Sequence, residues 1–265
     1  MPRVAASSYL NTAPLIWSFQ SGSMRESVKL DTTAAPARCA DLLANGRVDA
    51  ALVPVIEYAR MSDVAVVPGV CVGARRRVRS VVLVTKRARL EDVVAVALDT
   101  SSRTSAALMQ IIFREFIGRC PTFAQAPPDV ERMLAAHDAA LVIGDPAMTI
   151  ERSDVQMFDL ATLWNQYTGL GFVFALWMVR EEARARLQEV DWAAARDEGL
   201  KHREEIADKY AKTLALPRAD LVSYLNENIR YELDDDLTAG LNLFYRLAHK
   251  HGLAPTAQEL KTISQ

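Results

Sequence analysis

The chain has 265 residues, of which 50% are hydrophobic and 24% charged, and its formal net charge is −2. The length allows about two domains with a sizeable core. A net charge so close to zero excludes no class outright, but it gives no sign of a nucleic-acid or membrane-surface partner. The longest apolar run, GLGFVFALWMV, is too short to cross a bilayer, and polar residues interrupt the N-terminal segment before a signal-peptide core could form. We therefore expect a globular protein of the cytoplasm.

The first 150 residues contain the same βα pattern twice. VAASSYLNTAPLIWSF from Val4 and VALDTSSRTSAALMQIIF from Val96 each predict an apolar strand, a hydroxyl-rich turn and an amphipathic helix. LLANGRVDAALVPVIEY from Leu42 and MLAAHDAALVIGDPAM from Met133 then predict a helix end, a short strand and a loop with Pro and an acidic residue. Because both pairs recur in the same order, we predict two α/β lobes of matching plan, with a ligand cleft beyond the carboxyl ends of their parallel strands.

Two longer apolar strands, residues 80–86 and 172–179, flank the second copy and are placed to cross between the lobes. We therefore assign residues 1–85 and 173–265 to lobe one, and residues 86–172 to lobe two. From Glu181 onward the pattern is helical, and these helices should pack on lobe one and brace the hinge. The acidic cluster LDDDL (233–237) is typical of a helix N-terminus, which we favour over a binding feature.

The turn in the first copy, SSYLNTAP, supplies Ser8, Asn11 and Thr12. An Asn side chain donates and accepts hydrogen bonds without carrying charge, so Asn11 is suited to orient a hydroxyl or an ether and is a poor base. The tetrapeptide SYLN recurs at residues 223–226, but there it lies inside an amphipathic helical pattern, and we interpret that recurrence as coincidence.

The turn in the second copy, DTSSRTS (99–105), is rich in hydroxyl groups. If a helix begins near Ser101 or Ser102, its first amides have no partner within the helix and favour an anion. Arg103 would oppose the helix dipole unless an anion or an acidic side chain offsets its charge. The alternative is a plain helix cap in which Arg103 pairs with Asp99.

Several other chemistries have no support in the sequence. The four histidines form no catalytic or metal-binding set, and no HExxH, P-loop or nucleophile elbow occurs, so we predict no metal site. The odd number of cysteines and the lack of a CxxC pair favour reduced thiols in the core, at Cys39, Cys71 and Cys120. The arginines of ARRRVRS (74–80) form either a solvated edge or a patch that steers an acidic ligand to the cleft.

Six stretches, in order over residues 4–177, resemble the chorismate dehydratases of the futalosine route to menaquinone: SYLNTAPL, LANGRVDAALVPVIEY, VRSVVLVTK, ALDTSSRTSAAL, DAALVIGDPAM and TGLGFVFALW. The resemblance implies a two-lobed fold of the type II periplasmic-binding-protein class. It also implies a cofactor-free elimination of water from chorismate, giving 3-[(1-carboxyvinyl)oxy]benzoate. The small-molecule substrate is then the one expected partner, and the oligomeric state stays open.

The resemblance also assigns roles. Asn11 would orient the reacting ring and Ser80 would reach the cleft, as the catalytic pair. The substrate would contact Ser8, Ser102, Arg103, Thr104, Ser105, Gly144, Asp145, Thr168 and Gly169. Removal of the ring C3 hydrogen gives a dienolate whose charge fixed donors can stabilise. Three proton acceptors remain open: a carboxylate of the substrate, Asp145 or Glu57.

Two other readings are kept. A sibling family, the 1,4-dihydroxy-6-naphthoate synthases, carries a catalytic histidine at the place where this chain has Gly144, which argues against it. A solute-binding protein would have the same cleft without chemistry. The ligand-sensing domain of a transcription regulator is a further class, but we find no helix-turn-helix segment before lobe one in this sequence. The chain departs from the dehydratase pattern at Gly171, where Pro is usual.

Overall fold

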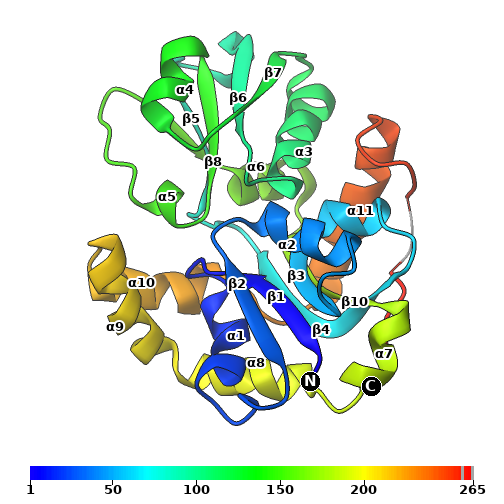
Figure 1. Ribbon diagram of the computed structural model, residues 1–265. Helices are drawn as coiled ribbons and strands as arrows, with labels where there is room; N and C mark the ends of the chain where they lie inside the picture. Colours follow the sequence, from blue (N-terminus) through cyan, green and yellow to red (C-terminus); the bar gives the residue numbers. More distant parts are fainter. Residues whose placement is uncertain (258–259, 264–265) are drawn as a thin grey trace.

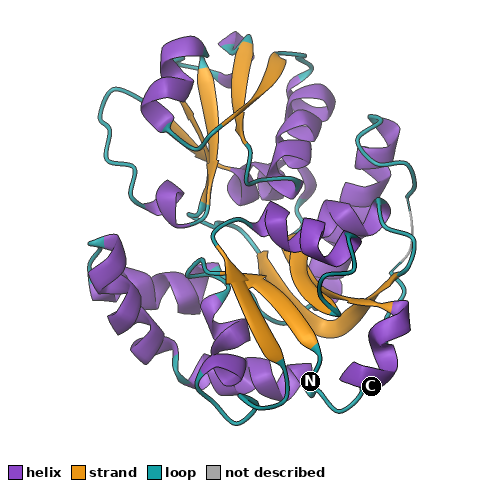
Figure 2. Ribbon diagram, viewed as in Figure 1, coloured by secondary structure: helices purple, strands orange, loops and turns teal. Residues whose placement is uncertain are grey.

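The computed structural model describes residues 1–257 and 260–263, which form two lobes that each contain a five-stranded sheet (Figures 1 and 2). The first sheet has the order β2-β1-β3-β10-β4 and consists of β1 (Arg3–Ser7), β2 (Lys29–Thr33), β3 (Ala50–Pro54), β4 (Val64–Ala74) and β10 (Phe172–Arg180). The second has the order β7-β6-β8-β5-β9 and consists of β5 (Val81–Thr85), β6 (Ala95–Asp99), β7 (Thr122–Ala126), β8 (Ala139–Ile143) and β9 (Gln156–Asp159).

The predicted repeat is confirmed by the strand pairing. In each sheet three parallel strands come from one βαβαβ run, β1 to β3 in lobe one and β6 to β8 in lobe two. The intervening helices are α1 (Ala13–Gln20), α2 (Pro36–Ala44), α3 (Thr104–Ile111) and α4 (Val130–Ala136). The apolar runs of β3 and β8 are buried along their whole length, as strands covered on both faces must be. The carboxyl ends of both runs therefore face the space between the lobes.

One antiparallel strand in each sheet comes from the chain as it arrives from the other lobe. β10 lies between β3 and β4, and β5 occupies the matching place between β8 and β9. We predicted that residues 1–85 belong to lobe one. Strand β5 (residues 81–85) instead pairs with β8 and β9 in the second sheet. The first crossing is thus the segment 75–80, which ends at Ser80, and the second is α6 (Leu160–Thr168) with the turn before β10.

The helices after β10 cover lobe one, and α11 also contacts lobe two, as expected for a brace. They are α7 (Arg184–Leu187), α8 (Trp192–Lys201), α9 (Arg203–Leu214), α10 (Arg218–Ser223), a π-helix at Tyr224–Asn228 and α11 (Asp235–Lys250). Helix α8 packs on α1, whereas α11 packs on both β10 and α3 (Figure 1). The acidic cluster begins α11, with the Asp234 carboxylate accepting the Leu237 amide at 2.9 Å, so its interpretation as a helix N-terminus is confirmed.

The remaining elements are short. Single turns of helix lie at Val55–Ala59, Leu90–Asp92, α5 (Asp145–Met148) and Glu181–Ala183, and a π-helix at Ile112–Ile117 continues α3. Cys39 and Cys71 are buried free thiols, but Cys120 is exposed, so the prediction of a core position is wrong for Cys120. Across the described residues, no helix is both long and apolar enough to pass through a membrane.

Candidate active site

A pocket lies between the lobes at the carboxyl ends of the parallel strands. Its walls come from the turn after β1, the end of β3, the turn after β6 and the end of β8, and Phe174 and Ala175 of β10 contribute from the antiparallel strand. The two hydroxyl-rich turns singled out in the sequence therefore face the same space. This is the position that the chain direction of parallel sheets favours for a ligand.

Six of the sequence-predicted residues line this pocket: Asn11, Ser102, Arg103, Thr104, Ser105 and Gly144. Ser80 is fully buried directly behind the wall, where its carbonyl accepts the Gly144 amide at 2.7 Å and its neighbour Val81 lines the pocket. The structure thus brings Asn11 and most of the predicted binding residues to one cavity, with Ser80 directly behind its wall.

Four predicted residues lie elsewhere. Ser8 and Asp145 line a groove on the other side of Tyr9, between α1 and α9. Thr168 ends α6 and donates to the Trp164 carbonyl at 2.7 Å, and Gly169 is the left-handed residue that terminates that helix. Thr168 and Gly169 therefore shape a helix end, which the sequence motif could not distinguish from a pocket wall.

Helix α3 begins later than predicted, at Thr104 instead of Ser101 or Ser102. The preceding residues form a turn around the buried Asp99 carboxylate, which accepts the Ser101 amide at 2.8 Å and the Ser101 hydroxyl at 2.6 Å. Burial raises the pKa of Asp99. With Asp99 satisfied by this turn, Arg103 does not pair with it.

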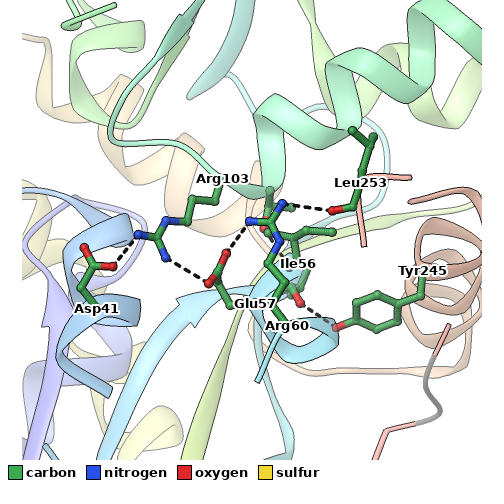
Figure 3. Close-up of polar contacts among 9 residues, drawn as sticks. Asp41, Ile56, Glu57, Arg60, Arg103, Tyr245 and Leu253 are labelled. Atoms are coloured by element: carbon green, nitrogen blue, oxygen red, sulfur yellow. Dashed lines mark hydrogen bonds and ion pairs between the residues drawn. The ribbon is translucent and has the colours of Figure 1, made fainter. Parts of the chain in front are cut away.

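Arg103 instead connects the two lobes (Figure 3). Its guanidinium contacts Glu57 at 3.0 Å and Asp41 at 2.5 Å, both on lobe one. The Glu57 side chain is only 6% exposed and lies between Arg103 and Arg60, whose guanidinium is 2.8 Å away (Figure 3). Two carboxylates thus offset the charge of Arg103, which explains how a cation is tolerated beside the helix N-terminus.

The hydroxyl groups at the start of α3 differ in their partners. Thr104 accepts the Ile56 amide at 3.2 Å, which leaves its own proton available. Ser102 is 95% buried, and within the described part of the chain its hydroxyl has no hydrogen-bond partner. An unpaired buried hydroxyl costs roughly 1–3 kcal/mol, and in a pocket it marks a place where a ligand oxygen would be accepted.

Two tyrosines complete the site, and the sequence did not reveal either. Tyr9 follows the first strand, hydrogen-bonds to Ser101 of the other lobe and lines the pocket. Tyr224 is the second residue of the repeated SYLN, and its buried hydroxyl donates to the Ser80 hydroxyl at 2.7 Å. The amphipathic pattern predicted only that residues 223–226 lie in a helix, and the tertiary structure is what places Tyr224 beside Ser80.

Other features of the chain play no part in this site. The arginines of residues 74–80 do not form one extended row, because Arg79 has a left-handed backbone with φ of 64° and Arg75 pairs with Asp234 at 2.6 Å. In the part of the chain that the structure describes, no group of three or more His, Cys, Asp or Glu residues is arranged to hold a metal ion.

Comparison with known proteins agrees with this architecture. The crystal structure of a protein from Archaeoglobus fulgidus superposes with a TM-score of 0.75 at 18% identity, covering 95% of this chain and 98% of that one. The periplasmic aliphatic sulphonate binding protein of Escherichia coli superposes with a TM-score of 0.64, also at 18% identity, covering 100% of this chain and 94% of that one. Similarities at this level of identity show the fold, which is the two-lobed periplasmic-binding-protein fold that the sequence predicted.

Sequence relatives are more specific. The chain is 34% identical over 232 residues to the chorismate dehydratase of Thermus thermophilus, covering 80% of this chain and 83% of that protein. It is 27% identical over 209 residues to the chorismate dehydratase of Campylobacter jejuni, covering 78% of each. A family model described as menaquinone biosynthesis matches residues 2–250. The chain therefore belongs to the menaquinone biosynthesis family.

Proposed function

We propose that this protein is a chorismate dehydratase, a cytoplasmic hydro-lyase that converts chorismate to 3-[(1-carboxyvinyl)oxy]benzoate without a cofactor. The observation that carries the proposal is the pocket in which the Asn11 turn of one lobe faces the unpaired Ser102 and the start of α3 in the other. Chorismate is a dianion with a hydroxyl and an ether, and these are the groups that such neutral donors recognise. The two relatives named as chorismate dehydratases support the same substrate.

One substrate carboxylate would bind at the start of α3. The amides of the first turn are open there, and Ser102 and Ser105 line the same pocket. Arg103 has a different role in this proposal. Because Asp41 and Glu57 already pair with it, Arg103 holds the lobes together around the substrate and its net charge does not recruit the anion.

The reaction requires one proton and one hydroxyl group to leave adjacent carbons. Loss of the ring C3 proton places charge on a dienolate that extends to the ring carboxylate, and the donors of α3 stabilise that charge. The C4 hydroxyl then leaves, its oxygen accepts a proton, and the ring becomes aromatic. The removed proton and hydroxyl together make up one water, so no oxidant or reductant is needed.

The positions of the two protein carboxylates favour the substrate as its own proton acceptor. Glu57 is held between two arginines and is not among the residues that line the pocket. Asp145 has a pKa raised to about 6 by burial, but it lies behind Tyr9 and accepts the Leu10 amide at 2.9 Å. A carboxylate of bound chorismate is already inside the pocket, and Asn11 would hold the ring so that it reaches the C3 proton.

The sibling activity, 1,4-dihydroxy-6-naphthoate synthesis, fits this chain less well. Gly144 stands where that family carries its catalytic histidine, and its backbone has φ of 70°. A Cβ atom at Gly144 would lie 2.4 Å from the Tyr9 ring, so this pocket has no room for a side chain there. The second alternative is a protein that binds chorismate without converting it, and the assay described next distinguishes it from a dehydratase.

The test is to incubate the purified protein with chorismate alone and to follow products by chromatography with mass detection. The proposal expects a product lighter than chorismate by one water. Chorismate bound but unchanged would indicate a binding protein, and the absence of binding would refute the substrate.

Asn11→Ala should retain binding and lose most of the turnover, whereas Asn226→Ala, at the exposed equivalent position of the second SYLN, should behave as the unmodified protein.

A further inference from the structure

Tyr224 reaches the active site from the far end of the chain. It begins the π-helix that follows α10, its side chain is fully buried, and its hydroxyl donates to the Ser80 hydroxyl at 2.7 Å across a sequence separation of 144 residues. Tyr224 does not line the pocket, so it would act on the substrate only through the side chains that it contacts.

The direction of this hydrogen bond is set by a chain of side chains. The Thr12 hydroxyl is 2.9 Å from that of Ser7 and donates to the Asn11 carbonyl oxygen at 3.2 Å. The Asn11 amide group is then free to donate, and the Asn11 side chain also hydrogen-bonds to the Tyr224 hydroxyl. Tyr224 thus accepts from Asn11 and donates to Ser80, so the proton of Ser80 is left for an acceptor in the pocket.

The backbone of Ser80 is held by separate contacts. Arg79 has its left-handed conformation because its amide donates to the Asp159 carboxylate at 2.6 Å, and the Val78 amide donates to the same carboxylate at 3.0 Å. The Ser80 carbonyl accepts the Gly144 amide. Removing the Tyr224 hydroxyl would therefore change the orientation of the Ser80 hydroxyl and leave its main chain in place.

We propose that Tyr224 is a positioning residue that aims the Ser80 hydroxyl proton at the leaving C4 oxygen of chorismate. The inference rests on the proposed function, since it assigns a task within that reaction. Burial keeps the Tyr224 phenol neutral by raising its pKa, so Tyr224 orients a donor and does not act as a base. The two SYLN segments then meet in space: Asn11 of one contacts Tyr224 of the other.

The test compares Tyr224→Phe with Tyr231→Phe, each assayed with chorismate for kcat and KM. Tyr231 is also a buried tyrosine, but its hydroxyl has no hydrogen-bond partner among the described residues, so Tyr231→Phe controls for loss of a buried hydroxyl. Loss of one orienting hydrogen bond should lower kcat about tenfold in Tyr224→Phe and leave KM within about twofold. Tyr231→Phe should change neither constant.

A double variant separates positioning from a general structural role. If Tyr224 acts through Ser80, adding Tyr224→Phe to Ser80→Ala should lower kcat by less than about threefold, because the donor is already absent. An equal loss in both backgrounds, a change in KM alone, or full activity of Tyr224→Phe would each overturn the inference. Absence of product from the unmodified protein would instead refute the proposed function, and the inference with it.

Discussion

The ring of Tyr9 in lobe one lies directly against the α-carbon of Gly144 in lobe two. A Cβ atom added at Gly144 would be 2.4 Å from Cε2 and 2.5 Å from Cζ of that ring. The Leu10 amide, next along the chain, donates to Asp145 at 2.9 Å. The lobes therefore meet on this side of the pocket through a contact that allows no side chain, so residue 144 controls how closely they approach.

Gly144→Ala should lower kcat/KM strongly. The substitution adds a methyl group at the contact with Tyr9 and places Ala at φ of 70° and ψ of −153°, a region that essentially only Gly occupies and that costs roughly 1–3 kcal/mol for other residues. Gly118→Ala is the control for a positive φ without the contact, because φ there is 69° with ψ of 34°, a milder left-handed conformation, and a Cβ would meet nothing within 4 Å. Both variants should lose thermal stability from the backbone, Gly144→Ala the more because of its ψ of −153°, but only Gly144→Ala should lose activity. Equal kcat/KM for the two variants would contradict a role for the Tyr9 contact.

Arg103→Ala should destabilise the protein by about 2 kcal/mol, the scale of a charge-assisted hydrogen bond in a partly buried setting. Glu57 would keep Arg60 as its partner but lose the contact that joins it to lobe two. The comparison is Arg132→Ala, whose pair with Asp129 is largely exposed and should be worth less than about 1 kcal/mol. Urea unfolding of the three proteins measures the difference. Equal midpoints would show that the Arg103 contacts add nothing to the closed arrangement.

Asp145→Asn should stabilise the protein at neutral pH. Burial raises the pKa of Asp145 to about 6, above its value in the unfolded chain, so the folded state holds the proton more tightly. The stability that this proton contributes is complete below the unfolded pKa and is lost as pH rises through about 6. Asn can still accept the Leu10 amide through its carbonyl oxygen.

The free-energy gain of Asp145→Asn over the unmodified protein, seen as a higher melting temperature, should therefore increase from pH 4 to pH 7 and then level off at roughly 1–2 kcal/mol, after allowance for partial exposure. Asp99 also has a raised pKa, but it is present in both proteins and cancels in the comparison. A gain that does not vary with pH would mean that Asp145 is not ionising in this range.

The local features of the fold could be predicted because they depend on short segments. The paired βα runs are visible as repeated patterns, and the turns that they contain, with Asn11 and the start of α3, line the pocket between the lobes. The apolar run 81–85 predicted a buried strand, but burial alone does not specify the partner, and β5 joined the second sheet. The spacing of apolar residues shows that a face of an element is buried, but it does not show which other element packs against that face.

The side-chain pairings that escaped prediction depend on contacts between distant segments. Tyr224 meets Ser80 across 144 residues, and Arg103 meets Asp41 across 62, so neither pairing leaves a local signal. Thr168 and Gly169 were carried over from a motif, and the structure places them at a helix end, away from the pocket. A motif locates a segment reliably, but the direction of each side chain is decided by packing.

Gly171→Pro, the residue usual in this family, should destabilise this particular chain. The Gly171 amide donates to the Asp236 carboxylate at 3.1 Å, and Pro has no amide proton to donate. A Cβ at residue 171 would also lie 2.7 Å from that carboxylate oxygen. Leaving Asp236 without this donor should cost roughly 1–3 kcal/mol, measured as a lower midpoint in urea. Adding Asp236→Ala removes the unpaired charge and the contact with the carboxylate but leaves the Leu237 side chain 2.8 Å from the Cβ position. Gly171→Pro should therefore cost less in the Asp236→Ala background than in the unmodified chain, without becoming neutral. A Gly171→Pro variant as stable as the unmodified chain would show that the hydrogen bond between the Gly171 amide and Asp236 contributes nothing to stability.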